Sequence, residues 1–124
     1  MGFRYILDGL NAEPALIAAA CTGDGHWFLE CARSYVGEGV VFDRFIGQNQ
    51  RIHFSLASAY VNIQVVNLMR FEACRGYNVQ LEWAVQANKA NLLSADASSE
   101  AGNAFKKTAY SVQSAGLLYI FTNV

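Results

Sequence analysis

Side chains that can bind metals gather in the stretch CTGDGHWFLEC, residues 21–31, which holds two cysteines, an aspartate, a histidine and a glutamate. A zinc site needs four such ligands, and paired ligands usually stand a few residues apart. Cys21, His26 and Cys31 are separated by four residues on each side, which matches no standard zinc pattern. On a helix, His26 and Glu30 would form an ordinary surface pair one turn apart. We therefore expect no metal site and no cofactor.

A carboxylate beside an imidazole is the second pattern that could do chemistry, because it raises the pKa of the ring and orients its tautomer for general-base catalysis. If 40–46 and 51–56 are paired strands, Asp43 and His53 lie nearly opposite each other, and Glu82 can join them in a pocket. His53 alternates with apolar neighbours, which favours a solvated pair on the outer face. We expect no catalytic residues, with Asp43, His53 and Glu82 as the alternative.

Local motifs of the common enzyme classes are missing from the sequence, including a glycine-rich phosphate loop, a serine nucleophile elbow and a CxxC pair. A pocket assembled from scattered residues leaves no such motif, so an enzyme is not excluded. The balance nevertheless favours a protein without catalytic activity.

The composition departs from that of a typical soluble domain mainly in its charge. Charged residues make up 15% of the 124 residues and hydrophobic residues 53%, whereas charged residues reach about 25% in typical domains. A small protein with so few charges can cover its surface by contact with copies of itself or with another protein. We therefore expect a single domain over 1–124 that forms a homo-oligomer. An uncharged but polar monomer surface is the alternative.

Nucleic acid and membranes are not expected as partners. The net charge is −1, which gives no overall attraction to polyanions. The N-terminal apolar run is too short for a signal peptide, and no stretch approaches the length of a membrane span. Three cysteines form no disulfide framework and suit a reducing compartment. We expect the protein in the cytoplasm or in an assembled particle.

Hydrophobic periodicity divides the chain into short elements. The N-terminal third contains two helix patterns, 11–21 and 24–36, which begin with the capping residues Asn11 and Asp24. The strand patterns lie at 3–8, 40–46 and 51–56.

The most extended pattern is a β-hairpin over 58–73 and 77–88, in which every second residue is apolar. A three-residue turn at 74–76 would bring apolar residues opposite each other, with Gly76 in the left-handed position. The alternative is a helix over 58–75 with Gly76 as its cap. Polar residues scatter around that helix and leave no single apolar stripe, which favours the hairpin.

The C-terminal third is less regular in its pattern. Residues 94–104 have low hydrophobicity and indicate a loop, 105–115 fit either a helix or a strand, and 117–124 indicate a terminal strand. The predicted fold is therefore α+β, with two N-terminal helices packed on a curved antiparallel sheet of five or six strands.

Uncharged amides form rows on the polar face of the predicted hairpin, where they can bond another protein. The predicted interface consists of Asn62, Gln64, Gln80, Gln86, Asn88, Ile120 and Phe121. Long strands, few charges and an apolar end favour a non-enzymatic structural subunit that self-assembles, such as part of a virion, a phage tail or a ring. The alternatives are a small pocket enzyme or ligand binder of cone-shaped α+β type, and a monomeric inhibitor that binds another protein.

Overall fold

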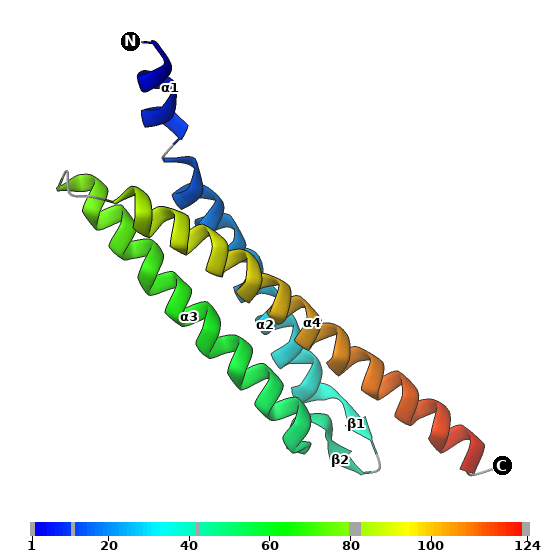
Figure 1. The fold of residues 1–124 in the computed structure, drawn as a ribbon. Helices are drawn as coiled ribbons and strands as arrows, with labels where there is room; N and C mark the ends of the chain where they lie inside the picture. The colour runs from blue at the N-terminus through cyan, green and yellow to red at the C-terminus, as the bar shows by residue number, and fades with distance from the viewer. Residues whose placement is uncertain (1, 11, 42, 80–82, 123–124) are drawn as a thin grey trace.

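The computed structural model describes residues 2–10, 12–41, 43–79 and 83–122 (Figure 1). In these residues the protein is built almost wholly of helices. The elements in chain order are α1 (Gly2–Leu10), α2 (Glu13–Glu38), β1 (Val40–Val41), β2 (Arg44–Phe45), a 3-10 turn η1 (Ile46–Gln48), α3 (Gln50–Asn78) and α4 (Ala84–Thr122).

Three long helices, α2, α3 and α4, run side by side in alternating directions, and each packs against the other two (Figure 1). The β1–β2 hairpin joins α2 to α3 at one end of the bundle, with Val40 paired to Phe45. Helix α1 extends beyond the opposite end and contacts α2. The prediction of an α+β fold with a sheet of five or six strands is wrong, because β1 and β2 are the only strands in the described residues.

Helix α2 is continuous where the sequence predicted two helices separated at residues 22–23. Two local contacts explain this continuity. The hydroxyl of Thr22 donates to the carbonyl of Ala18 at 2.7 Å, so the buried threonine is satisfied within the helix. Gly25 lies against Ile63 of α3, where a β-carbon would collide with the isoleucine side chain. The glycine therefore permits close packing of two helices, and it does not end α2.

The predicted hairpin over 58–73 and 77–88 is also wrong, since these residues belong to α3 and α4. Four apolar residues alternate at 59, 61, 63 and 65, and successive members lie about 200° apart on a helix. Ala59 and Ile63 are accordingly buried, whereas Val61 and Val65 are exposed. The same alternation would place all four on one face of a strand. The alternative of a helix over 58–75 is correct for these residues, but Gly76 does not cap it, because α3 continues to Asn78.

Other segments predicted as strands or as a loop are also helical. The strand at 3–8 lies in α1, the strand at 51–56 lies in α3, and the loop at 94–104 lies in the middle of α4. Helix α4 also continues through 105–115 and through 117–122, where a terminal strand was expected. The start of α3 has a clear local cause, because the side chain of Asn49 accepts a hydrogen bond from the backbone of Arg51 at 3.1 Å.

The inner face of α4 is a stripe of small side chains, which we call the α4 small-residue stripe. It consists of Ala87, Ala90, Ser94, Ala97, Ala101, Ala104 and Thr108, all buried. Their separations alternate between three and four residues, the spacing of a helix seam that faces its neighbours continuously. Small residues let helix axes approach closely, so this stripe explains how α4 can pack on both α2 and α3.

The larger core side chains come from α2 and α3 and pack onto this stripe. Leu29 of α2 and the pair Ile63 and Val66 of α3 belong to the same buried cluster as the alanines of α4. Phe28 and Leu56 lie at its margin. The core is therefore asymmetric: α3 supplies most of the branched side chains, whereas the buried residues of α2 other than Leu29 are small, like those of the α4 stripe.

Candidate functional site

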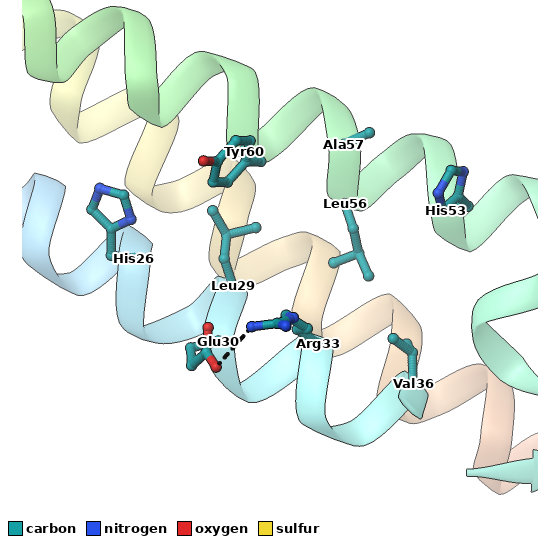
Figure 2. A pocket seen from close by; sticks show the side chains of 9 residues that line it. All are labelled: His26, Leu29, Glu30, Arg33, Val36, His53, Leu56, Ala57 and Tyr60. Carbon is teal, nitrogen blue, oxygen red and sulfur yellow. Dashed lines mark hydrogen bonds and ion pairs between the residues drawn. The ribbon is translucent and has the colours of Figure 1, made fainter. Parts of the chain in front are cut away.

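A groove between α2 and α3 is the larger of two cavities described on the bundle surface, with a volume of about 600 Å³. Figure 2 shows Leu29 of α2 and Leu56 of α3 reaching into the space between the two helices. The other lining residues lie within two turns of Leu29 on α2 and within about one turn of Leu56 on α3. The complete lining is His26, Leu29, Glu30, Arg33, Val36, His53, Leu56, Ala57 and Tyr60.

The rim of this α2–α3 groove contains both histidines of the chain. Figure 2 places them apart along it, with His26 on α2 toward the left of the view and His53 on α3 toward the right. Glu30 and Arg33 form an ion pair at 3.4 Å on the same wall, and both side chains are largely exposed. An exposed pair of this kind contributes little to stability. The groove thus combines an apolar floor with a polar, nearly neutral rim.

A smaller groove of about 230 Å³ lies between α3 and α4 and has acidic side chains. Asp96 and Glu100 project from α4, and Val65 and Val66 line the α3 side. The amide of Asn62 donates to the carboxylate of Glu100 at 2.6 Å, which links the two helices across this groove. The two sides of α3 therefore face grooves of different charge.

The structure places Asp43 and His53, the predicted catalytic alternative, in separate elements. Asp43 lies in the turn between β1 and β2 with a positive φ of 59°. His53 lies in the first turns of α3, where its ring centroid is 6.3 Å from that of Phe54. Glu82 falls outside the described residues. His53 lines the α2–α3 groove without Asp43, and a catalytic role for these residues stays a prediction.

The predicted interface residues are divided between helices α3 and α4. Asn62 and Gln64 lie on α3, and Gln86 and Asn88 lie near the start of α4. Gln80 falls outside the described residues. Ile120 and Phe121 belong to the last turns of α4. No shared strand face connects these residues, and their contact with a partner stays a prediction.

The metal-ligand types of residues 21–31 are distributed around α2. Cys21 and Cys31 are free and partly buried, and His26 faces the α2–α3 groove. Within the part of the chain that the structure describes, no three histidine, cysteine, aspartate or glutamate side chains are grouped closely enough to hold a metal ion.

A feature that sequence reasoning missed is an apolar outer face on α3, which we call the α3 outer stripe. It consists of Phe54, Val61, Val65 and Leu68, whose exposed fractions are 61%, 57%, 52% and 70%. Their spacing of seven, four and three residues keeps them on one side of the helix. The signal in the sequence is this spacing together with an absence of Asp, Glu, Lys and Arg from 52–69.

Comparison of the sequence with known families identifies the family to which this helical chain belongs. A family model described as the acyl-CoA dehydrogenase C-terminal domain matches residues 1–105. The chain belongs to this family. The match runs from α1 through the β-hairpin and α3 into the second half of α4. A search of curated proteins found no match.

Membership of the acyl-CoA dehydrogenase family corrects the function predicted from the sequence. The matched domain is part of a dehydrogenase, and within the described residues the only strand pair is the short β1–β2 hairpin. The self-assembling virion, phage-tail or ring subunit with an amide-rich hairpin face is therefore wrong. The alternative of a small pocket enzyme or ligand binder of cone-shaped α+β type is also wrong, because it requires a larger sheet than the β1–β2 pair. Among the described helices, none is both long and apolar enough to cross a membrane.

Proposed function

We propose that this chain serves as the helical domain of an acyl-CoA dehydrogenase and contributes packing surfaces to its assembled form. The observation that carries the proposal is the family match over residues 1–105. The three-helix arrangement supports it, because the family description is that of a domain and the bundle offers long helical faces to its surroundings.

The exposed apolar side chains support a role in assembly. Phe54, Leu68 and several other large apolar residues are more than half exposed on the bundle surface. Contiguous apolar surface of this kind is typical of contact sites between proteins. A homo-oligomer, a reducing compartment and one domain over 1–124 belong to the proposal as well.

A domain exchange tests the proposal directly. Residues 1–105 would replace the helical C-terminal domain of a working acyl-CoA dehydrogenase, and acyl-CoA-dependent reduction of an electron-accepting dye would be measured together with native mass. We expect the exchanged enzyme to assemble and to reduce the dye. The reason is that a domain of the same family presents matching surfaces to the remainder of the enzyme.

The matched control carries an unrelated three-helix bundle of equal length in the same place. A further control carries the present domain with Ile63→Asp, which puts a charge into its core. If the exchanged enzyme is fully helical but resembles the unrelated bundle in both mass and dye reduction, the proposed function is wrong.

A further inference from the structure

The smaller groove of the bundle, which lies between α3 and α4 and which we call the α3–α4 groove, has apolar walls. Val66 and Ala97 are the buried residues of its lining, each 4% exposed, and Val65 and Leu93 stand beside them at 52% and 40%. Its volume is about 230 Å³, whereas sites for drug-sized ligands usually hold about 300–1,000 Å³. The α3–α4 groove therefore suits a single long side chain better than a free ligand of that size.

Two carboxylates stand at the rim of this groove. Asp96 and Glu100 both line it and are both exposed. They are four residues apart on α4, so about 6 Å separates them along the axis and they share one side of the helix. Glu100 accepts a hydrogen bond from the amide of Asn62 at 2.6 Å, and this donor is neutral. Neither carboxylate takes part in an ion pair within the described residues.

The basic residues of α4 lie too far along the helix to neutralise this pair. Lys89 precedes Asp96 by seven residues, and Lys106 and Lys107 follow Glu100 by six and seven. These separations correspond to about 9–10 Å along the axis. Exposed charges at such a distance are largely screened at physiological salt, where the Debye length is about 8 Å.

The nearest basic residue of α3, Arg70, is held on the other side of its helix. Its guanidinium donates to the side-chain oxygen of Asn67 and lies 4.2 Å from the centre of the Phe71 ring. Asn67 and Phe71 follow Tyr60 by seven and eleven residues, which places both within about 20° of it on the helix. Tyr60 lines the α2–α3 groove, so Arg70 is directed toward that groove, and the α3–α4 groove stays negative.

We propose that the α3–α4 groove binds an arginine side chain presented by a segment of a partner protein. The stem of the arginine lies along Val65 and Leu93, and its guanidinium bonds to Asp96 and Glu100. A long basic side chain fits this arrangement because its apolar stem covers apolar surface while its charged head stays at the rim. The inference does not depend on the proposed function, and the domain exchange can succeed or fail without affecting it.

The geometry of the two carboxylates favours arginine over lysine. A guanidinium is planar and carries five donors in a fixed fork, so it can bond to two neighbouring carboxylates at once. The ammonium of lysine is a compact point charge and is less suited to bridge them. Glu100 uses one oxygen for Asn62, which leaves its other oxygen available to an incoming donor. Arginine is also among the residues that contribute most to protein contacts.

Binding of short peptides to the full chain tests the proposal. Three neutral-background peptides of alanine, glutamine and leucine would differ only in one central residue, which is arginine, citrulline or lysine. Citrulline has nearly the shape of arginine but no charge. In NMR titrations we expect weak binding, in the millimolar range, with the arginine peptide binding about fivefold more tightly than the citrulline peptide. Signals of the residues that line the α3–α4 groove should shift.

The matched protein variants remove one charge at a time and keep the shape of the site. Asp96→Asn and Glu100→Gln should each weaken binding of the arginine peptide about threefold, and both together about tenfold. Glutamine at position 100 keeps an oxygen that can accept from Asn62, so the link between α3 and α4 is preserved. Asp24→Asn removes an exposed carboxylate of α2 and should leave the affinity unchanged.

Two adjacent leucines of α4 test the apolar part of the contact. Leu93 lines the α3–α4 groove, whereas Leu92 is 67% exposed and lies about 100° away on the helix. Leu93→Ala should therefore weaken the arginine peptide several-fold, and Leu92→Ala should have little effect. Circular dichroism of each variant checks that the helices are intact.

Three results would overturn the proposal. The first is an arginine peptide that causes no shift in the groove signals at several millimolar. The second is equal binding of the arginine and citrulline peptides, because the charge then plays no part. The third is unchanged affinity in the variant that carries both Asp96→Asn and Glu100→Gln. Equal binding of the lysine peptide would overturn the assignment to arginine.

Discussion

The two faces of α3 have similar side chains but different surroundings. The inner face presents Ala59, Ile63 and Val66, which are 0%, 0% and 4% exposed. The outer stripe presents Phe54, Val61, Val65 and Leu68, which are apolar to at least the same degree and are more than half exposed. Hydrophobicity alone therefore does not distinguish the core side of this helix from the side available to a partner.

What distinguishes the two faces is the residue that each one meets. Ile63 lies against Gly25 of α2, and the backbone of Ser98 in α4 also lies close to this glycine. The core thus arises where large residues on α3 meet small ones on α2 and α4. Phe54, Val61, Val65 and Leu68 of the outer stripe are instead more than half exposed in the described part of the chain.

The largest expected effect is the difference in unfolding free energy between a substitution on the inner face of α3 and one on its outer stripe. Ile63→Ala removes a fully buried side chain and should lower the free energy of unfolding by about 2–5 kcal/mol. Val61→Ala changes an exposed side chain two positions away and should alter it by less than about 0.5 kcal/mol. Urea denaturation followed by circular dichroism in dilute solution measures both. Equal losses would show that both faces are buried in the monomer.

Gly23 and Gly25 of α2 give the next largest expected effect, because only Gly25 lies against another helix. Gly25→Ala places a methyl group against Ile63, and overpacking of this kind costs about 1–3 kcal/mol. Gly23→Ala meets no atom within 4 Å, so it should stabilise the helix by about 0.5–1 kcal/mol. Thermal unfolding of the two variants should therefore shift in opposite directions.

Adding Ile63→Val to Gly25→Ala is the corresponding control, because it removes the methyl group that the alanine would strike. The pair should be less destabilised than the sum of the two single changes. Strict additivity would mean that Gly25 and Ile63 do not meet.

Substitution of the residue that caps the start of α3 should lower stability by a smaller amount, and it should affect both faces of the helix equally. Asn49→Ala removes the side-chain oxygen that accepts from the backbone of Arg51 and should cost about 0.5–2 kcal/mol. Asn49→Ser keeps an oxygen in that position and should cost much less. The same urea titration distinguishes the two variants. A similar loss in both would mean that the side chain does not cap the helix.

The smallest expected effect concerns the pKa of Glu72, which lies near the end of the outer stripe. A hydrogen bond from Arg75 holds the pKa of the exposed Glu72 carboxyl below its usual value. The associated stability is present above the unfolded pKa and is lost as the pH falls through the folded pKa. In an NMR titration, Arg75→Gln should return the pKa of Glu72 toward its usual value. Added salt should move it in the same direction, whereas an unchanged pKa in both tests would mean that Arg75 is not the cause.

The strand prediction for residues of α3 is wrong because an alternating apolar pattern fits both a strand and this helix. Alternate apolar residues mark one face of a strand, but in a helix they mark two opposite faces. The helix alternative was rejected for lack of a single stripe, and α3 in fact has two. The polar residues between them, such as Asn62 and Gln64, lie at the flanks and not on a solvated sheet face.

The predictions for α2 and α4 are wrong for a different reason. Small residues indicated a helix break or a loop, but here they lie inside long helices. Gly23 and Gly25 indicated a break, and residues 94–104 indicated a loop because they are weakly hydrophobic. Small side chains also allow close helix packing, and the three-and-four spacing of the α4 small-residue stripe was the available signal. Both histidines line the α2–α3 groove, but this groove depends on helix packing that no local pattern reports, and a functional role for either histidine stays a prediction.

The α4 small-residue stripe has a consequence for axial alignment. A shift of α4 by seven residues, about 10 Å, would put one small buried side chain in place of another along most of the seam. Near-identical neighbours thus carry little positional information. The alignment depends instead on the few unlike contacts, such as the bond from Asn62 to Glu100 and the ring of Phe28 beside Gly102. Without them, the helix could settle at more than one height with similar buried area.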